Sequence, residues 1–211
     1  MDLNLGYTNA ILKYALEKKL LRNELAYVLA TAYWETGRTM KPVKEAYWLS
    51  EDWRKKNLRY YPWYGRGFVQ LTWEANYKKA GDKLGVDLIK NKDLALDPDI
   101  AAKILVDGMI DGWFTGKKLS DYITLKKSDF IEARRIINGV DKKNEIAEIA
   151  KQYDADLKRV GYGEGSTQKP SEKPVESVPA SSSGSTAEKK PTNLLEVIIE
   201  LLKAIFGGKN G

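Results

Sequence analysis

Apolar residues recur every three or four positions through most of the first ~160 residues, a spacing typical of helices. Residues 8–20 show it, and residues 23–36 are Ala-rich and apolar on most sides, which predicts a buried helix ending at Gly37. Further helices are predicted from Thr72 to Gly81 or Gly85, from Asp97-Pro98 to Trp113-Phe114, from Ser128 to Ile137, and from about Asn144 to Arg159. The pattern therefore predicts a mainly α domain with six or seven helices and little sheet.

Three segments interrupt the helical pattern. Residues 38–63 contain Pro42 and many aromatic side chains, and we expect an irregular loop there. Residues 65–72 are entered through glycines and carry Phe68, Val69 and Leu71, which favours a short extended segment. Residues 115–127 are expected to form a basic loop.

The composition changes after residue 163. Residues 164–192 contain Ser, Pro, Lys, Glu and Thr with almost no apolar residue, as in a flexible, disordered linker. For residues 193–211 we predict an amphipathic helix over 193–206 and a Gly-rich end, and the predicted helix is too short and too charged to span a bilayer. This helix could lie on a membrane surface, self-associate, dock on a partner, or dock on its own domain. We expect three regions: a catalytic domain over 1–163, the linker, and this helix.

The chain contains no histidine and no cysteine. These absences exclude Ser–His triads, His or Cys zinc sites, thiol nucleophiles and disulfides. Carboxylate chemistry is the main possibility that remains. The net charge is +6, and the whole excess lies in residues 1–163, which contain 29 Lys or Arg and 23 Asp or Glu. A basic surface suits a polyanionic partner or simply solubility.

Two glutamates are candidates for acid/base chemistry. Glu35 falls in the last turn of the predicted buried helix, where burial and the partly negative carbonyl ends favour a protonated acid. A solvated glutamate at a helix end is the alternative. Glu45 follows ten residues later in the aromatic-rich loop, where side chains such as Tyr47, Trp48 and Tyr60 could stack on sugar rings or pin the loop to the core.

Several separate motifs occur in order along the chain. They are Trp34-Glu35-Thr36-Gly37, Glu45, Tyr64 to Thr72, Asn76-Tyr77 and Ile136-Ile137-Asn138-Gly139. Together they resemble glycoside hydrolase family 19, the chitinase-like family that includes many phage endolysins. The resemblance spans about residues 5–160, and the short, basic domain is similar to the phage endolysin branch. It implies a lysozyme-like helical domain with a substrate cleft.

The resemblance implies that Glu35 is the general acid and Glu45 the general base of an inverting glycosidase, whose carboxyls stand roughly 6.5–9.5 Å apart. It further implies a water-holding role for Thr72. The implied substrate-binding residues are Tyr64, Arg66, Gln70, Thr72, Asn76 and Asn138. No metal or cofactor is implied. One departure is that the final helix lacks the family's arginine near Glu145 to Ala150, for which Lys142 or Lys143 could substitute.

These implications predict an endolysin-type enzyme that cuts β-1,4 bonds between the N-acetyl amino sugars of bacterial peptidoglycan. The alternatives are a chitinase, a lytic transglycosylase, or a membrane-active or interaction protein that works through residues 193–206. Nucleic acid is not expected as a partner, because no nucleic-acid-binding motif is present. The N-terminus shows no signal-peptide pattern, so we expect synthesis in the cytoplasm and action on the wall after release.

Overall fold

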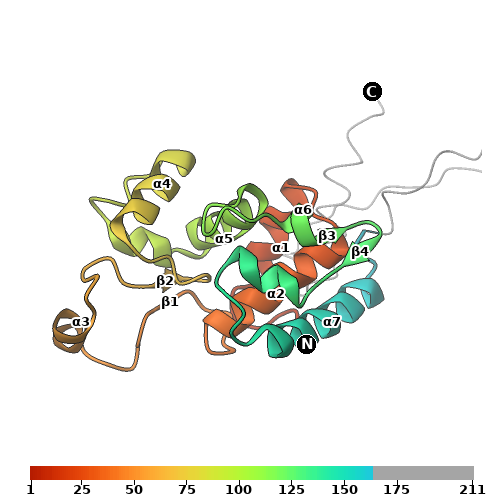
Figure 1. The fold of residues 1–211 in the computed structure, drawn as a ribbon, viewed down its shortest axis with the longest axis horizontal. Coiled ribbons are helices and arrows are strands. Elements are labelled where there is room, and N and C mark those ends of the chain that lie inside the picture. Colours follow the sequence, from red (N-terminus) through yellow and green to blue (C-terminus); the bar gives the residue numbers. More distant parts are fainter. Residues whose placement is uncertain (164–211) are drawn as a thin grey trace, which may run out of the picture.

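The computed structural model describes residues 1–163, and within them the chain is mainly helical, as predicted. The predicted linker (164–192) and C-terminal helix (193–211) lie outside the described residues. The larger part of the domain is built from four helices, shown in Figure 1. They are α1 (Thr8–Glu17), α2 (Arg22–Glu35), α5 (Pro98–Asp111) and α7 (Lys143–Arg159).

Helix α2 is the buried centre of this larger part. Residues 25–32 are completely buried without interruption, as the Ala-rich run predicted. Within the described residues, α2 and α7 form the most extensive contact between two elements, and α1 packs against α5. Because each fully buried Leu or Val side chain stabilises the fold by about 1.5–3 kcal/mol, the position of α2 is strongly determined. Its last residue, Glu35, is held in place with it.

A smaller lobe stands at the other end of the molecule (Figure 1). The two short strands β1 (Val43–Lys44) and β2 (Arg66–Gly67) form an antiparallel pair, with Val43 opposite Gly67 and Lys44 opposite Arg66. Around them lie α3 (Glu51–Asn57), α4 (Glu74–Leu84) and the 3-10 helix η1 (Lys92–Leu96).

Several boundaries follow local sequence chemistry. The Asp97 carboxylate accepts hydrogen bonds from the backbone N–H groups of Asp99 and Ile100, both at 3.0 Å, so it caps α5 as predicted. Helix α4 ends at Gly85, whose φ of +67° is the left-handed conformation common after helices. Glu35 is the final residue of α2, which confirms its predicted place.

Other local predictions were wrong. Residues 38–63 are not wholly irregular, because α3 forms there with Ser50 accepting a hydrogen bond from the Trp53 N–H. Thr72 does not cap α4; its hydroxyl donates to the Gln70 carbonyl instead, and the helix starts after Trp73.

The segment after α5 also differs from the prediction. The supposed basic loop contains α6 (Leu119–Tyr122) and a hairpin of β3 (Ile123–Thr124) and β4 (Lys127–Ser128). No α-helix starts at Ser128, whose hydroxyl accepts a hydrogen bond from Asn23 at 2.8 Å. The residues that follow form the 3-10 helix η2 (Glu132–Ile136). A tertiary contact therefore decided the role of Ser128.

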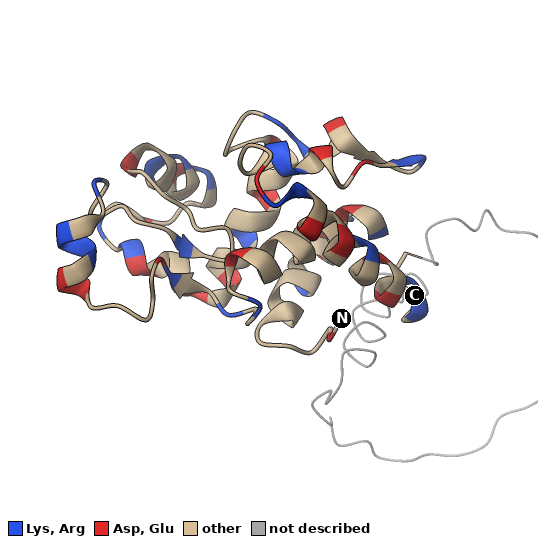
Figure 2. Cartoon of the chain, turned by 60° about the horizontal axis from the view of Figure 1, so that its bottom comes forward, with Lys and Arg blue, Asp and Glu red and all other residues tan. Residues whose placement is uncertain are grey.

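The charged residues are mixed on the surface. Figure 2 shows Lys and Arg on both lobes with Asp and Glu among them, as in an ordinary solvated surface. Within residues 1–163, the helices are all too short or too polar to cross a membrane.

Gly67 in β2 provides a test of how tightly the small lobe is packed. Its φ is +84°, and a Cβ there would lie 2.7 Å from the Ala95 carbonyl oxygen. Gly116 has nearly the same φ, +83°, but open space around it. We expect Gly116→Ala to cost about 1–2 kcal/mol of unfolding free energy through the backbone alone. Gly67→Ala should cost a further ~1–3 kcal/mol through the clash.

Urea denaturation of the two variants measures this difference. Equal losses would show that the η1 backbone yields to the added methyl group.

Candidate active site

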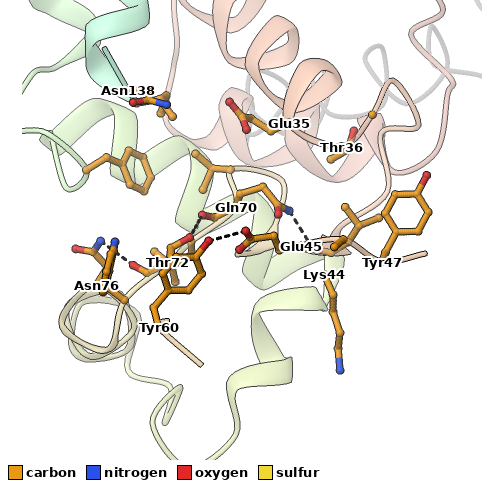
Figure 3. A pocket seen from close by; sticks show the side chains of 18 of the residues that line it. Glu35, Thr36, Lys44, Glu45, Tyr47, Tyr60, Gln70, Thr72, Asn76 and Asn138 are labelled. Atoms are coloured by element: carbon orange, nitrogen blue, oxygen red, sulfur yellow. Dashed lines mark hydrogen bonds between the residues drawn. The ribbon is translucent and has the colours of Figure 1, made fainter. Parts of the chain in front are cut away.

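A cleft of about 740 Å³ lies between the two lobes. It is lined by the end of α2, residues 43–48, Tyr60, residues 69–73, the start of α4, and Phe114, Ile137 and Asn138 of the large lobe. Both predicted acidic residues, Glu35 and Glu45, line it (Figure 3). They come from different lobes, because one ends α2 and the other directly follows β1.

Glu35 has a cationic partner. The Arg134 guanidinium, on η2, donates from Nη1 to Glu35 Oε1 at 2.8 Å and from Nε to the Asp141 carbonyl at 3.1 Å. The Arg134 side chain is only 5% exposed and that of Glu35 is 18% exposed, so the pair is largely shielded from water. An ion pair in this setting holds the carboxyl in one orientation.

The prediction that Lys142 or Lys143 takes the place of the family's arginine near the acid is wrong. Lys142 pairs with Glu145, and Lys143 pairs with Glu132, so neither reaches Glu35. The arginine comes from η2 rather than from the last helix. Only tertiary packing brings it to Glu35, 99 residues away in sequence.

Three hydrogen bonds join Glu45 to Tyr60 and Gly65. The Tyr60 hydroxyl donates to Oε1 at 2.6 Å, and the Gly65 N–H donates to Oε2 at 2.9 Å. The Glu45 N–H in turn donates to the Gly65 carbonyl at 2.7 Å, which extends the β1–β2 pairing by one residue on each strand. A Cβ at position 65 would lie 2.7 Å from Gln70 Oε1, so a larger residue there would displace the Gln70 amide.

Four of the predicted polar residues line the cleft: Gln70, Thr72, Asn76 and Asn138. Figure 3 shows them around the two glutamates. The Gln70 amide donates to the Val43 and Gly67 carbonyls at 3.1 and 3.2 Å, so it links both strands of the small lobe. The Asn76 amide donates to the Thr72 carbonyl at 2.9 Å. These bonds fix the side chains at the wall of the cleft.

Tyr64 and Arg66 do not line the cleft, and their predicted contact with substrate is wrong. Tyr64 is fully buried and Arg66 is only 4% exposed. The Arg66 guanidinium donates to Asp93 at 2.8 Å and to the Tyr77 hydroxyl at 2.9 Å, and it also stacks 3.8 Å from the centre of the Tyr64 ring. These two residues form the support beneath the β1–β2 pair.

The aromatic residues divide between the two expected roles. Tyr47, Trp48 and Tyr60 line the cleft, and Trp48 is 71% exposed, as suits a surface for a flat sugar ring. Trp63 packs instead against the core beside Tyr77, with a ring distance of 5.5 Å.

Two cleft residues, Trp73 and Phe114, were not singled out from the sequence as site residues. Trp73 has an unusual φ of +74° and packs 5.0 Å from the Tyr60 ring. The sequence signal for Trp73 was its place in the loop before α4, because ligand-binding residues commonly lie on loops.

Residues 28–119, which contain both glutamates, match the family model described as class I chitinase, glycoside hydrolase family 19. Over this segment the chain is thus similar to the family that the sequence motifs indicated. It is 32% identical to Chitinase 11 of Oryza sativa subsp. japonica over 125 residues, which is 49% of this chain and 48% of that protein. It is 31% identical to Endochitinase EP3 of Arabidopsis thaliana over 125 residues, 56% and 42% of the two chains.

The chain therefore spans about half the length of these relatives or less. A protein described as Inactive chitinase-like protein 1, of Hevea brasiliensis, is also similar, at 40% identity over 63 residues, 29% of this chain and 20% of that one. Proteins of this similarity thus include one described as inactive, and activity depends on the side chains in the cleft.

The support beneath the cleft makes a pH-dependent prediction. Burial by itself raises the pKa of Asp93, but hydrogen bonds from Lys44 and Arg66 outweigh it, and the pKa lies below its ordinary value. A lowered pKa means that Asp93 stabilises the fold above the unfolded value of about 3.9 and that this stabilisation is lost as pH falls through the folded pKa. Asp93→Asn should therefore destabilise the domain at pH 7 and progressively less below pH ~4.

Urea unfolding of the wild type and of Asp93→Asn, at pH 7 and below pH ~4, measures the free energy of unfolding of each. The control is Asp82→Asn, which removes an exposed pair with Lys78 and should change stability by less than ~1 kcal/mol. A destabilisation by Asp93→Asn that stays constant down to pH 2 would contradict the prediction.

Proposed function

We propose that this chain is a glycosidase that hydrolyses β-1,4 bonds between N-acetyl amino sugars of bacterial peptidoglycan, acting on the wall after release in the manner of an endolysin. The observation that carries the proposal is that Glu35 and Glu45 line one cleft in different surroundings, one beside a guanidinium and the other held by a phenol and a backbone N–H. Hydrolysis with inversion requires two carboxyl groups in one cleft, one that donates a proton to the leaving oxygen and one that accepts a proton from water.

Glu35 is proposed as the general acid. Arg134 holds Oε1, which leaves Oε2 to carry a proton to the oxygen of the leaving sugar. The position of Glu35 at the end of a buried helix keeps this group fixed while the glycosidic bond breaks. Protonation of the leaving oxygen prevents an unfavourable alkoxide from forming.

Glu45 is proposed as the general base. Its two oxygens each accept one hydrogen bond from the protein, and each retains a lone pair that can accept from a water molecule. The Thr72 hydroxyl donates a hydrogen bond to the Gln70 carbonyl, so its oxygen is available to accept a hydrogen bond from the same water molecule. The water attacks the anomeric carbon on the face opposite the leaving group, and the product has the inverted configuration.

Peptidoglycan is proposed over chitin because the domain is basic and peptidoglycan carries anionic peptides and associated polymers. Chitin is the second candidate, favoured by the similarity to plant chitinases. Both polymers present N-acetyl sugars to the exposed ring of Trp48 and to the amides of Asn76 and Asn138, so the polar wall of the cleft suits either. Comparing the turnover of sacculi with that of chitin oligomers decides between them.

Removing either carboxyl should abolish most of the activity. We expect Glu35→Gln and Glu45→Gln each to lower kcat for the release of reducing sugar from purified sacculi by about 100-fold to 10,000-fold, because a proton-transfer group contributes on that scale. The matched control is Glu74→Gln, which changes an exposed glutamate in the first turn of α4 and should retain full activity. Substantial turnover by Glu35→Gln would refute the assignment.

The reaction products provide a separate test. An inverting hydrolase acting on a β bond should first release the α anomer, with no 1,6-anhydro sugar. Proton NMR during the first minutes of digestion identifies the anomer, and mass spectrometry of the muropeptides identifies the bond. Anhydro products would instead show a lytic transglycosylase, and initial β anomer would show retention.

A further inference from the structure

Two side chains from the stretch between Glu45 and Gly65 form hydrogen bonds with Glu45. After Glu45 the chain runs outward through Tyr47 and Trp48, forms α3, and comes back through Tyr60 to Gly65. On this path two side chains reach Glu45 from different directions. Arg54 reaches its backbone, and Tyr60 reaches its carboxylate.

Arg54 clamps the backbone. Its Nε donates to the Glu45 carbonyl at 2.8 Å and its Nη2 donates to the Ala46 carbonyl at 2.9 Å, while Nη1 pairs with Glu51 at 3.1 Å. The guanidinium is 5% exposed, although it lies in a helix whose other charged residues face water. Ala46 has a φ of +49°, a conformation that L-residues adopt only when their surroundings enforce it. The two bonds from Arg54 supply that constraint.

Tyr60 clamps the carboxylate. The bond of 2.6 Å from its hydroxyl to Oε1 is short, as expected for a donor facing an ionised acceptor. The Tyr60 ring is itself fixed by Trp73, and the Arg59 guanidinium lies 5.4 Å from the Trp73 ring. Burial and the hydrogen bond to Glu45 raise the pKa of the Tyr60 phenol to about 12, so the hydroxyl keeps its proton at neutral pH.

We propose that Tyr60 and Arg54 are positioning residues for Glu45, holding its carboxylate and its backbone so that one fixed lone pair faces the attacking water. This inference rests on the proposed function, because it needs Glu45 to be the base. Without these contacts the carboxylate would rotate among several rotamers, and only some would direct an oxygen at the water. The role of α3 is then to carry Arg54 to the site, which gives the helix a function beyond covering the lobe.

Removing the phenolic hydroxyl should slow the chemical step and leave substrate binding intact. Tyr60→Phe retains the ring against Trp73, and we expect kcat to fall about tenfold to a hundredfold with KM changed less than about threefold. The control is Tyr61→Phe, which deletes a hydroxyl one residue away at a position that does not line the cleft, and it should match wild type. Arg54→Lys, which keeps the charge but not the two-pronged geometry, should also lower kcat with little change in KM.

A measurement that does not depend on activity follows the Tyr60 phenol directly. In the full chain labelled with ¹³Cζ-tyrosine, Glu45→Gln should lower the Tyr60 pKa from about 12 toward its ordinary value of about 10. An unchanged titration would show that the hydroxyl does not bond Glu45 in solution and would overturn the inference.

The outcomes separate the two proposals. If Glu45→Gln is inactive but Tyr60→Phe keeps kcat within about twofold of wild type, Glu45 is the base and the positioning role is wrong. If Glu45→Gln remains active, the proposed function fails, and the positioning role fails with it. If Tyr60→Phe lowers kcat alone and Tyr61→Phe does not, the inference stands.

Discussion

The complete burial of residues 25–32 in helix α2 is the constraint on which the rest of the structure depends. Because residues 25–32 are covered on all sides, the helix cannot rotate or slide without exposing apolar surface, at about 0.8 kcal/mol for each buried CH₂. Glu35, at its end, inherits this rigidity and meets Arg134 from the other side. A group that has to deliver a proton along one line benefits from being the last residue of such a helix.

The second lobe is held together differently, because its sheet is very small. Its strands have two residues each, and they are held by a buried guanidinium rather than by a long ladder of backbone bonds. Arg66 donates hydrogen bonds to Asp93, to the Tyr77 hydroxyl and to the carbonyls of Pro62 and Tyr64, and removing its guanidinium would remove all four bonds at once. Tyr64 and Arg66, which the motif resemblance implied to be substrate-binding residues, thus stabilise the lobe that carries Glu45.

The two glutamates are supported in contrasting ways. Glu35 owes its place to a helix and one ion pair, whereas Glu45 lies where a strand ends and is held by bonds to residues 54, 60 and 65. The proposed inverting hydrolysis requires two carboxyl groups in one cleft, one to donate a proton and one to accept a proton. Both glutamates line the cleft of about 740 Å³ between the lobes.

The sequence by itself determined the helical class, the buried run of α2 with Glu35 at its end, the Asp97 cap of α5, and the polar residues Gln70, Thr72 and Asn76 of the cleft wall, since these depend on periodicity and local motifs. Tertiary structure alone decided that Arg134 pairs with Glu35, that Tyr64 and Arg66 turn inward, that Ser128 bonds Asn23, and that Arg54 and Tyr60 converge on Glu45. The physical reason is that a polar side chain bonds whichever partner the fold brings within about 3 Å, and its neighbours in sequence do not reveal that partner.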